Sequence, residues 1–298
     1  MELNRNHLAV FHAVARAGGF SRAADALMVS QPAVSLQVAE LERALGMKLF
    51  DRLPRGVRLT EAGRVLSDHA ARIAAIEQEA RSAMLELKGL KRGRLSVGAS
   101  QTIGVYLLPE VFGAFSRRHP DVKLDLEIAN TDIVQKKLGD GLFDLALTEG
   151  FIESEDLEAA VFRQDELVPI APPEHALLKR RGRGKPVTAA ELCREPLILR
   201  ETGSGTRAVV EHHLAKLGLS IRPIMSLGST EAVKRAVASG IGLAIVSRLA
   251  LETELNAGAL AIVPVSDLKI RRPLHRLELR GKERSAATKA FLATLAGS

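Results

Sequence analysis

The sequence predicts an all-α N-terminal unit that ends in one long helix, followed by a C-terminal α/β region of two lobes. Three observations carry the prediction. Short amphipathic segments fill the first ~45 residues, a helical pattern without proline runs from residue 60 to about 90, and strands alternate with helices from residue 93 onward. The chain has 298 residues, of which 46% are hydrophobic. That length and composition are sufficient for two or three domains with buried cores.

The first two helices are short and are separated by glycine. Their apolar positions are Leu8, Phe11, Val14 and Ala15 in the first helix, and Ala23, Ala24 and Leu27 in the second. Gly18-Gly19 ends the first helix, and Ser21 is the expected N-cap of the second. Two such helices followed closely by a third have the proportions of a helix-turn-helix unit.

The third helix, predicted over residues 31–45, has two faces of different character. Its aliphatic stripe is formed by Val34, Val38, Leu41 and Leu45, and its other face by Pro32, Ser35, Leu36, Ala39 and Arg43. Ser30 or Gln31 caps this helix, and Pro32 is tolerated in its first turn. A helix that is anchored by one stripe and exposes small polar groups at its N-terminal end suits the major groove of duplex DNA. We therefore expect DNA binding, with Ser30 among the contacting residues.

The sequence of residues 48–59 predicts a strand, a Pro-Arg-Gly turn and a second strand. Such a hairpin beside a groove-facing helix is a wing. Arg52, Arg55 and Arg58 gather on it, and guanidinium groups there suit phosphate or minor-groove contacts. The predicted winged helix-turn-helix domain covers residues 1–59.

Residues 60–92 predict a long dimerisation helix and a hinge. Apolar positions spaced three and four apart are Leu66, Ala70, Ile73, Ala80, Met84 and Leu87. Glu77 interrupts this stripe, and Ile76 continues it beside that position. A helix about 45 Å long with one apolar face and little local chain to cover it is expected to pair with a second copy. The alternative is that it lies on the chain's own C-terminal domain. The charged, glycine-containing stretch 88–94 is the expected linker.

The C-terminal region, residues 93–298, alternates strands and helices in two series. Strands are predicted near 95–99, 122–128, 143–147, 166–171, 197–200, 222–227, 242–247 and 274–279, and helices near 103–118, 131–139, 188–193, 205–217, 230–239, 247–255 and from about 284. The last elements are expected to return to the first series. Lobe I is then 93–165 plus 266–298 and lobe II is 166–265, with crossovers near 163–167 and 264–268 forming a hinge.

Hydroxyl groups follow several predicted strands and each time precede a helix. Helix N-termini at the carboxyl edge of parallel strands offer free amides and partial positive charge, so this arrangement suits an anion. The candidate effector-binding residues are Ser100, Gln101, Thr102, Thr148, Thr202, Ser204, Ser229 and Thr230. Taken one at a time, each is more often an ordinary helix cap. The rim is expected at Thr148-Glu149 and Val246-Ser247, and Arg200 or Arg207 pairs either with the anion or with a carboxylate of the chain.

Composition narrows the class of partner. The chain carries 42 Lys and Arg against 35 Asp and Glu, a net charge of +7, which suits nucleic acid. Nine Phe, one Tyr and no Trp argue against single-strand recognition by stacking, so double-stranded DNA is the expected partner. No signal sequence and no run of ~20 apolar residues is found, and we expect a cytoplasmic protein without membrane contact. Cys193, the single cysteine, is expected to be a packed thiol rather than a redox sensor.

Signatures of enzymes and metal sites are missing from the sequence. Gly203-Ser204-Gly205 is neither a phosphate-binding loop nor a nucleophile elbow. The eight histidines, including the adjacent pair His212-His213, lack metal-ligand spacing. We expect no enzyme activity, no catalytic residue, no metal and no cofactor. The cationic run 179–185 is expected to be a solvated loop, with secondary DNA contact as the alternative.

An ordered set of motifs resembles the LysR-type transcriptional regulators over nearly the full chain. It includes Ser21-x-Ala23-Ala24, Ser30-Gln31-Pro32-Ala33-Val34-Ser35, Leu45-Gly46, Leu49-Phe50-x-Arg52 and Leu59-Thr60-x-Ala62-Gly63. The residues for which the resemblance implies DNA contact are Gln31, Pro32, Ser35 and Arg52. Many relatives have Arg where this chain has Leu36, which cannot bond guanine but can press on a thymine methyl group. The alternative for Leu36 is an exposed apolar residue without a role.

The resemblance also implies a mechanism. The C-terminal lobes are similar to a type 2 periplasmic-binding-protein fold, and a metabolite that binds between them changes how homodimers assemble into a homotetramer on DNA, with RNA polymerase as a further partner. The stretches 98–104 and 200–207 look most like the branch of carbon-fixation and sulfur-assimilation regulators, so a phosphorylated metabolite or inorganic oxyanion is the expected effector. Two alternatives stay open: a binding-fold enzyme with an appended DNA-binding head, and a nucleoid-type protein that binds duplex DNA broadly.

Overall fold

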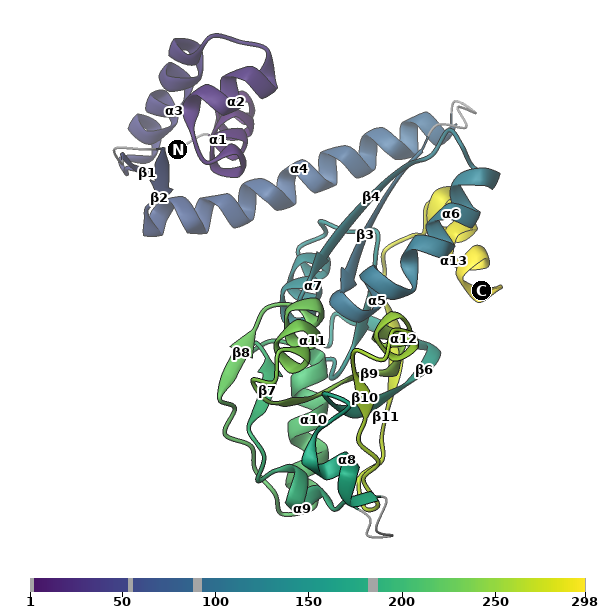
Figure 1. The fold of residues 1–298 in the computed structure, drawn as a ribbon. Coiled ribbons are helices and arrows are strands. Elements are labelled where there is room, and N and C mark those ends of the chain that lie inside the picture. The colour runs from purple at the N-terminus through teal and green to yellow at the C-terminus, as the bar shows by residue number, and fades with distance from the viewer. Residues whose placement is uncertain (1–2, 53–55, 88–92, 182–186, 298) are drawn as a thin grey trace. The chain divides into compact units, whose positions relative to one another are not determined.

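The computed structural model describes residues 3–52, 56–87, 93–181 and 187–297, and the chain divides into two compact units. The first unit contains the N-terminal helices, a small hairpin and α4 as far as Met84, and the second contains the α/β region (Figure 1). The elements of the first unit are α1 (Arg5–Ala17), α2 (Phe20–Leu27), α3 (Gln31–Leu45), β1 (Phe50–Arg52), β2 (Val57–Leu59) and α4 (Glu61–Leu87). The predicted winged helix-turn-helix and long helix are thereby confirmed; the linker segment 88–92 lies outside the described residues.

The three N-terminal helices pack around a shared aliphatic core. Its buried members include Leu8, Phe11, Val14, Ala23, Ala24, Val34, Val38 and Leu41. Gly18 ends α1 in the left-handed conformation (φ 64°), as predicted. The start of α2 differs from the prediction, because Gly19 is its N-cap and Ser21 lies inside the helix. Phe20 is the first residue of α2. Its ring packs edge-on against the ring of Phe50, with 5.7 Å between the centroids, and this contact holds Phe20 at the core.

The start of α4 is fixed to the chain just before the wing. Thr60 Oγ1 donates to the Lys48 carbonyl at 2.7 Å and accepts from the Gly63 N–H at 3.0 Å. A Cβ at Gly63 would lie 2.1 Å from the Leu49 carbonyl oxygen, so only glycine allows α4 to approach this closely. The close approach sets the direction in which α4 leaves the domain.

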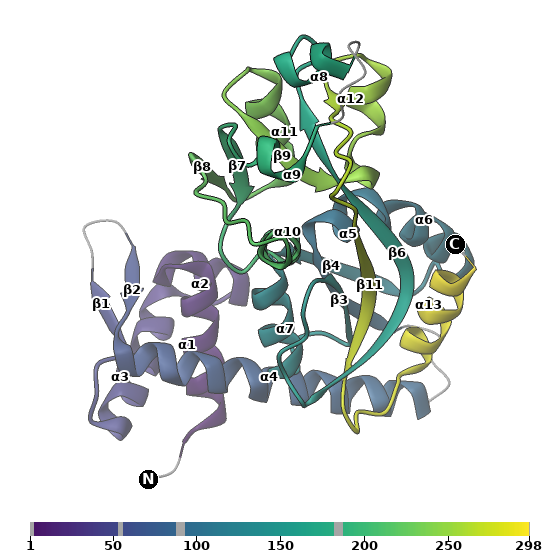
Figure 2. The ribbon, with the colours of Figure 1, turned by 90° about the horizontal axis from the view of Figure 1, so that it is seen from below.

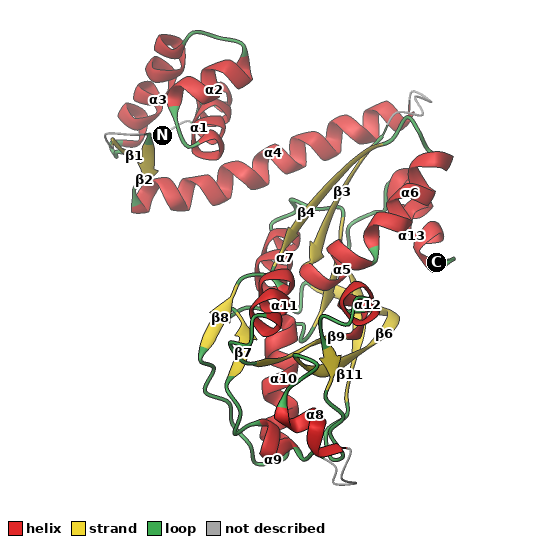
Figure 3. Cartoon of the chain, in the orientation of Figure 1, coloured by secondary structure: helices red, strands yellow, loops and turns green. Residues whose placement is uncertain are grey.

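The second unit contains one continuous sheet whose two ends are wrapped by helices (Figure 3). Its elements are β3 (Arg94–Ser100), α5 (Gln101–Tyr106), α6 (Leu108–Arg118), β4 (Lys123–Ala129), α7 (Thr131–Gly139), β5 (Leu145–Glu149), β6 (Leu157–Ala171), α8 (Ala176–Arg181), α9 (Ala189–Leu192), β7 (Leu197–Arg200), α10 (Gly205–Lys216), β8 (Met225–Leu227), α11 (Thr230–Ala238), β9 (Leu243–Ser247), the 3₁₀ helix η1 (Arg248–Ala250), α12 (Glu252–Asn256), β10 (Ala261–Ile262), β11 (Ile270–Leu279) and α13 (Ala286–Ala296). The helix expected over 103–118 is split into α5 and α6, because Pro109 stands in the first turn of α6.

Strand order in this sheet is β4-β3-β5-β11-β6-β9-β7-β8, with β10 added to β6. The strands β4, β3 and β5 are parallel, and so are β8, β7 and β9. Strand β11 is antiparallel to both β5 and β6, and β6 is antiparallel to β9. Each predicted lobe therefore has a parallel α/β core, and the long antiparallel pair β6–β11 joins the two (Figure 2).

The two lobes have separate hydrophobic cores. In lobe I, Val97, Phe115, Leu147 and Phe291 belong to one buried cluster; in lobe II, Leu192, Leu199, Val210 and Ile245 belong to another. Strand β11 contributes Ile270 to the lobe II core and Leu274 to the lobe I core. The second crossing therefore lies a few residues beyond the expected 264–268, because β11 stays paired with β6 through the whole passage.

Candidate DNA-binding surface and effector site

The N-terminal end of α3 presents small polar groups to solvent. Ser30 is the N-cap, and its Oγ accepts the Ala33 N–H at 3.4 Å. Gln31 and Pro32 are exposed, and Gln31 Nε2 donates to Ser35 Oγ at 3.0 Å. Because the opposite face, with Val34, Val38 and Leu41, is buried in the domain core, these groups point away from the protein. This is the arrangement required of a helix that enters a DNA groove.

Two apolar side chains lie exposed beside these polar groups. Leu36 is 58% exposed, which leaves its side chain free for the expected contact with a thymine methyl group. Met28, which sequence reasoning did not single out, is 91% exposed and caps α2 in the left-handed conformation at φ 55°. A methionine in that conformation is uncommon, and no sequence pattern signals it.

The wing is a two-stranded antiparallel hairpin in which Arg52 pairs with Val57. Arg58 is exposed, and its Nη2 lies 3.2 Å from Asp51 Oδ2 on the facing strand. The guanidinium is therefore held by a carboxylate of its own hairpin. Arg55 lies outside the described residues.

The apolar stripe predicted for α4 divides into two parts. Leu66 and Ala70 pack into the core of the N-terminal domain, whereas Ile73, Ile76 and Met84 are exposed on this chain. The first turns of the helix thus belong to the domain, and the later turns offer apolar side chains to solvent.

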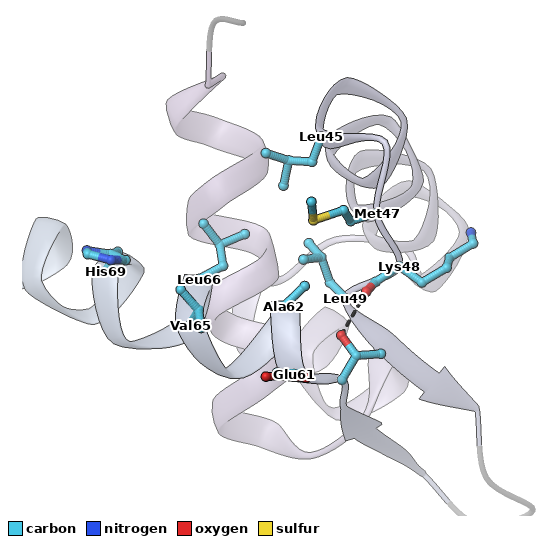
Figure 4. A pocket seen from close by; sticks show the side chains of 10 residues that line it. Leu45, Met47, Lys48, Leu49, Glu61, Ala62, Val65, Leu66 and His69 are labelled. Atoms are coloured by element: carbon cyan, nitrogen blue, oxygen red, sulfur yellow. Dashed lines mark hydrogen bonds between the residues drawn. The ribbon is translucent and has the colours of Figure 1, made fainter.

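The first turns of α4 also border an apolar groove of about 600 Å³ (Figure 4). Its lining comes from the end of α3, the segment before the wing and α4, and consists of Leu45, Met47, Lys48, Leu49, Thr60, Glu61, Ala62, Val65, Leu66 and His69. Met47 and Val65 are each about 60% exposed at its rim. Val65 and Ile76 are eleven residues apart and so lie on one face of the helix, the face that borders the groove at Val65.

In the α/β unit, a buried arginine joins the two lobes. Arg272 of β11 is 1% exposed, and its Nε donates to Asp165 Oδ2 at 2.8 Å. Its remaining donors reach Thr102 Oγ1 on α5 at 3.2 Å and Thr206 Oγ1 on α10 at 2.9 Å. Asp165 also accepts from Ser247 Oγ at 2.8 Å. One guanidinium thus binds both lobes and the crossing strand β6.

Glu149, at the end of β5, is a second buried charge beside this arginine. It is 2% exposed, and Oε1 lies 3.5 Å from Arg272 Nη1. Ser100 and Thr206 both donate their hydroxyls to its carboxylate. Thr148-Glu149 and Val246-Ser247 were expected on the rim, and this expectation is wrong: all four are buried, and hydroxyls of the chain already bind the Glu149 carboxylate.

The backbone around Glu149 is also closed against lobe II. Thr131 Oγ1 donates to the Glu149 carbonyl at 3.0 Å and accepts from the Gly205 N–H at 3.2 Å. A Cβ at Gly205 would lie 2.0 Å from the Glu149 carbonyl oxygen, so α10 begins against β5 with no room for a side chain. This contact requires glycine.

The predicted hydroxyl groups gather in this region but differ in exposure. Five of them are buried: Ser100, Thr102, Thr148, Ser204 and Thr230. Gln101 and Ser229 are half-buried, and Thr202 is exposed. Ser229 is an ordinary N-cap, because its Oγ accepts the Ala232 N–H at 3.1 Å. The buried hydroxyls mostly bind partners of the chain itself, so a ligand has to replace those partners.

Arg200 and Arg207 both pair with carboxylates of the chain. Arg200 is 3% exposed; its Nη1 donates to Thr230 Oγ1 at 3.1 Å and its Nε lies 2.7 Å from Glu201 Oε2. Arg207 Nε lies 2.8 Å from Glu211 Oε1 one turn along α10. Of the two, Arg200 lies beside a predicted effector residue and is the better placed for an anion.

Sequence reasoning missed the central role of Arg272 and Asp165. The available signal for Arg272 was its place between Ile270 and Leu274 on the buried face of the strand, which indicates a paired buried charge. Asp165 lies in the polar stretch 163–166, where no pattern marks it. It also missed Tyr106 of α5, whose hydroxyl donates to Glu231 of α11. Burial and that hydrogen bond to a carboxylate raise the pKa of Tyr106.

Other predicted features have modest structural roles. Cys193 follows α9, packs against the lobe II core, and has a pKa raised by burial and by Asp267. Among the described residues, no three His, Cys, Asp or Glu side chains form a group able to hold a metal ion. Over the same residues, no helix combines the length and the apolar character needed to cross a membrane.

Comparison with known proteins covers both units. Residues 5–64 match the family model of the bacterial regulatory helix-turn-helix proteins, lysR family, and residues 88–298 match the LysR substrate binding domain. A RuBisCO operon transcriptional regulator of Allochromatium vinosum is 37% identical over 98% of this chain and 95% of its own length.

Solved structures agree with these matches. The regulatory domain of Synechocystis PCC6803 CcmR, in complex with 2-PG, is 29% identical with a TM-score of 0.64, covering 69% of this chain and 97% of that one. A full-length OxyR variant from Pseudomonas aeruginosa is 25% identical with a TM-score of 0.70, covering 99% of this chain and 95% of that one. The helix-turn-helix unit, the two-lobed α/β unit and both family matches show that this chain belongs to the LysR family of transcriptional regulators.

Proposed function

We propose that this LysR-type regulator reads duplex DNA with α3 and the wing, and that a small anionic metabolite bound between lobes I and II controls it. The observation that carries the proposal is the buried interlobe network of Arg272, Glu149 and the hydroxyls of Thr102 and Thr206, to which both lobes contribute. A ligand that exchanges for part of this network changes how the lobes are held, and such differential binding is what shifts a conformational equilibrium.

The proposed effector is a phosphorylated metabolite. CcmR, whose regulatory domain is similar to this one, was solved with 2-PG, and a similar full-length relative is a RuBisCO operon regulator. In this chain Arg200, Thr230 and the start of α11 provide a guanidinium, a hydroxyl and helix amides together, which suits a phosphate group.

The test is calorimetry of the full chain with 2-phosphoglycolate (2-PG), inorganic phosphate and sulfate. We expect 2-PG to bind, and Thr102→Val and Thr230→Val each to weaken the binding. Thr253→Val, an exposed change on α12, is the matched control and is expected to leave it intact. Binding that survives both buried substitutions contradicts this site, and failure of all three anions to bind contradicts the anionic effector.

We further propose that α4 pairs two chains, with the groove beside Val65 as part of the contact. Exposed apolar side chains on one face of α4 and an adjoining apolar groove favour burial by a second copy. Ile76→Glu is expected to shift the chain toward monomer in light-scattering measurements. Ala74→Glu, on the opposite face of the helix, is the control, and equal effects of the two changes contradict the proposal.

Assembly of dimers into a homotetramer, contact with RNA polymerase and a cytoplasmic location are parts of the same proposal. An enzymatic role would require turnover by the full chain, and we expect none with 2-PG. A nucleoid-type role would give DNA binding with little preference between sequences and a steep salt dependence.

A further inference from the structure

One contact between the lobes lies apart from the Arg272 network. Tyr106 of α5, in lobe I, donates its hydroxyl to Glu231 Oε1 of α11, in lobe II. The Nζ of Lys234, one turn further along α11, lies 5.2 Å from the centroid of the Tyr106 ring. The phenol is therefore held by a carboxylate and an ammonium of the opposite lobe.

Lys234 fixes the position of this carboxylate. It is 3% exposed, and its Nζ lies 2.8 Å from Glu231 Oε1 and 2.8 Å from Glu254 Oε1 and donates to the Ala250 carbonyl at 2.7 Å. With its donors used in this way, Lys234 is a rigid anchor. The Glu231 side chain is 49% exposed, so it is the member of this cluster that a ligand can reach from solvent.

Glu231 is also the resident negative charge at the start of α11. Burial opposes its ionisation, but hydrogen bonds from Lys234 and Tyr106 hold its pKa below the ordinary range. It directly follows Thr230, whose hydroxyl accepts from Arg200. An anion placed at Arg200, Thr230 and the amides of this helix end has to displace the Glu201 carboxylate, which already pairs with Arg200. It would also lie one residue along the helix from the charge of Glu231, and like charges repel.

We infer that Tyr106 and Glu231 form a gate that opposes effector binding and must release when the anion binds. This inference rests on the proposed function and adds a regulatory element to it. Tyr106 holds the carboxylate beside the anion position, and Lys234 returns it there when the ligand leaves. Effector binding and the Tyr106–Glu231 hydrogen bond are coupled in both directions. An effector that displaces Glu231 breaks this hydrogen bond and so removes one contact between the lobes.

The test is calorimetric titration of the full chain with 2-PG. Glu231→Gln keeps an acceptor for the tyrosine hydroxyl but removes the charge, and Tyr106→Phe removes the hydroxyl that positions the carboxylate. We expect each to tighten binding about fivefold or more, a typical size for coupling between sites. Glu252→Gln removes an exposed charge from α12 in the same lobe and is expected to change affinity less than about twofold, since no contact links it to the anion position.

A second readout is the fluorescence of Tyr106. Tyr106 is the single tyrosine and the chain has no tryptophan, so its ultraviolet emission reports on this residue alone. A carboxylate acceptor quenches phenol emission, so Glu231→Gln is expected to brighten the free protein, and 2-PG is expected to brighten the unmodified chain.

The outcomes separate the gate from the proposed function. If the unmodified chain binds 2-PG and both variants bind with equal or weaker affinity, the gate is wrong and the effector site stands. If binding appears only in the variants, the gate is supported. If none of the three proteins binds 2-PG, the effector assignment is wrong and the gate falls with it.

Discussion

Replacing Arg272 by Met is expected to be among the most damaging single changes in the α/β unit. The substitution keeps an unbranched side chain but removes the guanidinium. It leaves Asp165 and Glu149, which are 5% and 2% exposed, without their shared counter-charge, and it leaves the hydroxyls of Thr102 and Thr206 without a donor. Removing one partner of a buried ion pair costs about 3–5 kcal/mol.

The loss is expected to appear as a lower unfolding temperature. For a unit of this size 1 kcal/mol corresponds to about 2–4 °C, so the predicted decrease is about 6–20 °C. Unfolding is best followed by the emission of Tyr106, because that residue lies in the α/β unit and is the single tyrosine. Arg271→Met is the matched control; its side chain is exposed on the same strand, and the change is expected within about 0.5 kcal/mol.

A double-mutant cycle distinguishes lost charge pairing from lost packing. If Arg272 acts through Asp165, then Asp165→Asn in the Arg272→Met background removes an uncompensated charge and recovers about 1 kcal/mol or more. Additive effects of the two substitutions, or a loss at Arg272→Met no larger than at Arg271→Met, would refute the reasoning.

Four other substitutions test separate parts of the structure. Gly205→Ala places a Cβ 2.0 Å from the Glu149 carbonyl oxygen and is expected to destabilise the α/β unit by more than about 2 kcal/mol, measured by the same emission; an equal stability would show that α10 can shift. Met28→Gly relieves a left-handed non-glycine residue and is expected to raise the melting temperature by an amount equivalent to about 1 kcal/mol, and a decrease would show that Met28 packs in solution. Burial and, to a smaller extent, the charge of Arg16 lower the pKa of His12 below its ordinary value of 6.5. The folded N-terminal domain is therefore most stable with respect to His12 above about pH 6.5, and its free energy of unfolding declines as the pH falls and this side chain has to take up a proton. His12→Leu is expected to flatten the dependence of stability on pH, measured by acid titration of the helical circular dichroism signal. Leu36→Arg is expected to change base preference at one operator position in a selection of binding sites, and an unchanged preference contradicts a base contact by Leu36.

Periodicity predicted the elements well because each helix and strand buries one regular face. Strand 197–200 and helix 131–139 have the predicted bounds, and Val34, Val38 and Leu41 of α3 are buried as their spacing requires. The exposed face of α3 followed from the same argument. Local chemistry at element ends was harder to predict: Ser21 is a good N-cap by type, yet Phe20 starts α2 because tertiary packing holds its ring.

The centre of the effector region was predicted only in part. Hydroxyls that follow strands were a sound guide, since Ser100, Thr102 and Thr230 each bind a buried charged side chain there. The charged residues that bind them come from distant parts of the chain. Arg272 and Thr102 are 170 positions apart, and Tyr106 and Glu231 are 125 apart, so no local pattern predicts their pairing.

Discrimination among DNA sequences, and its modulation by an anion, is the central property proposed for this chain. The most direct measurement is a nuclease footprint of the full chain on the region upstream of its own gene, with excess scrambled competitor DNA, in the absence and presence of 2-PG. We predict protection of paired half-sites that survives the competitor and changes in extent when 2-PG is added. No protection beyond that of scrambled DNA, with or without the ligand, would contradict it.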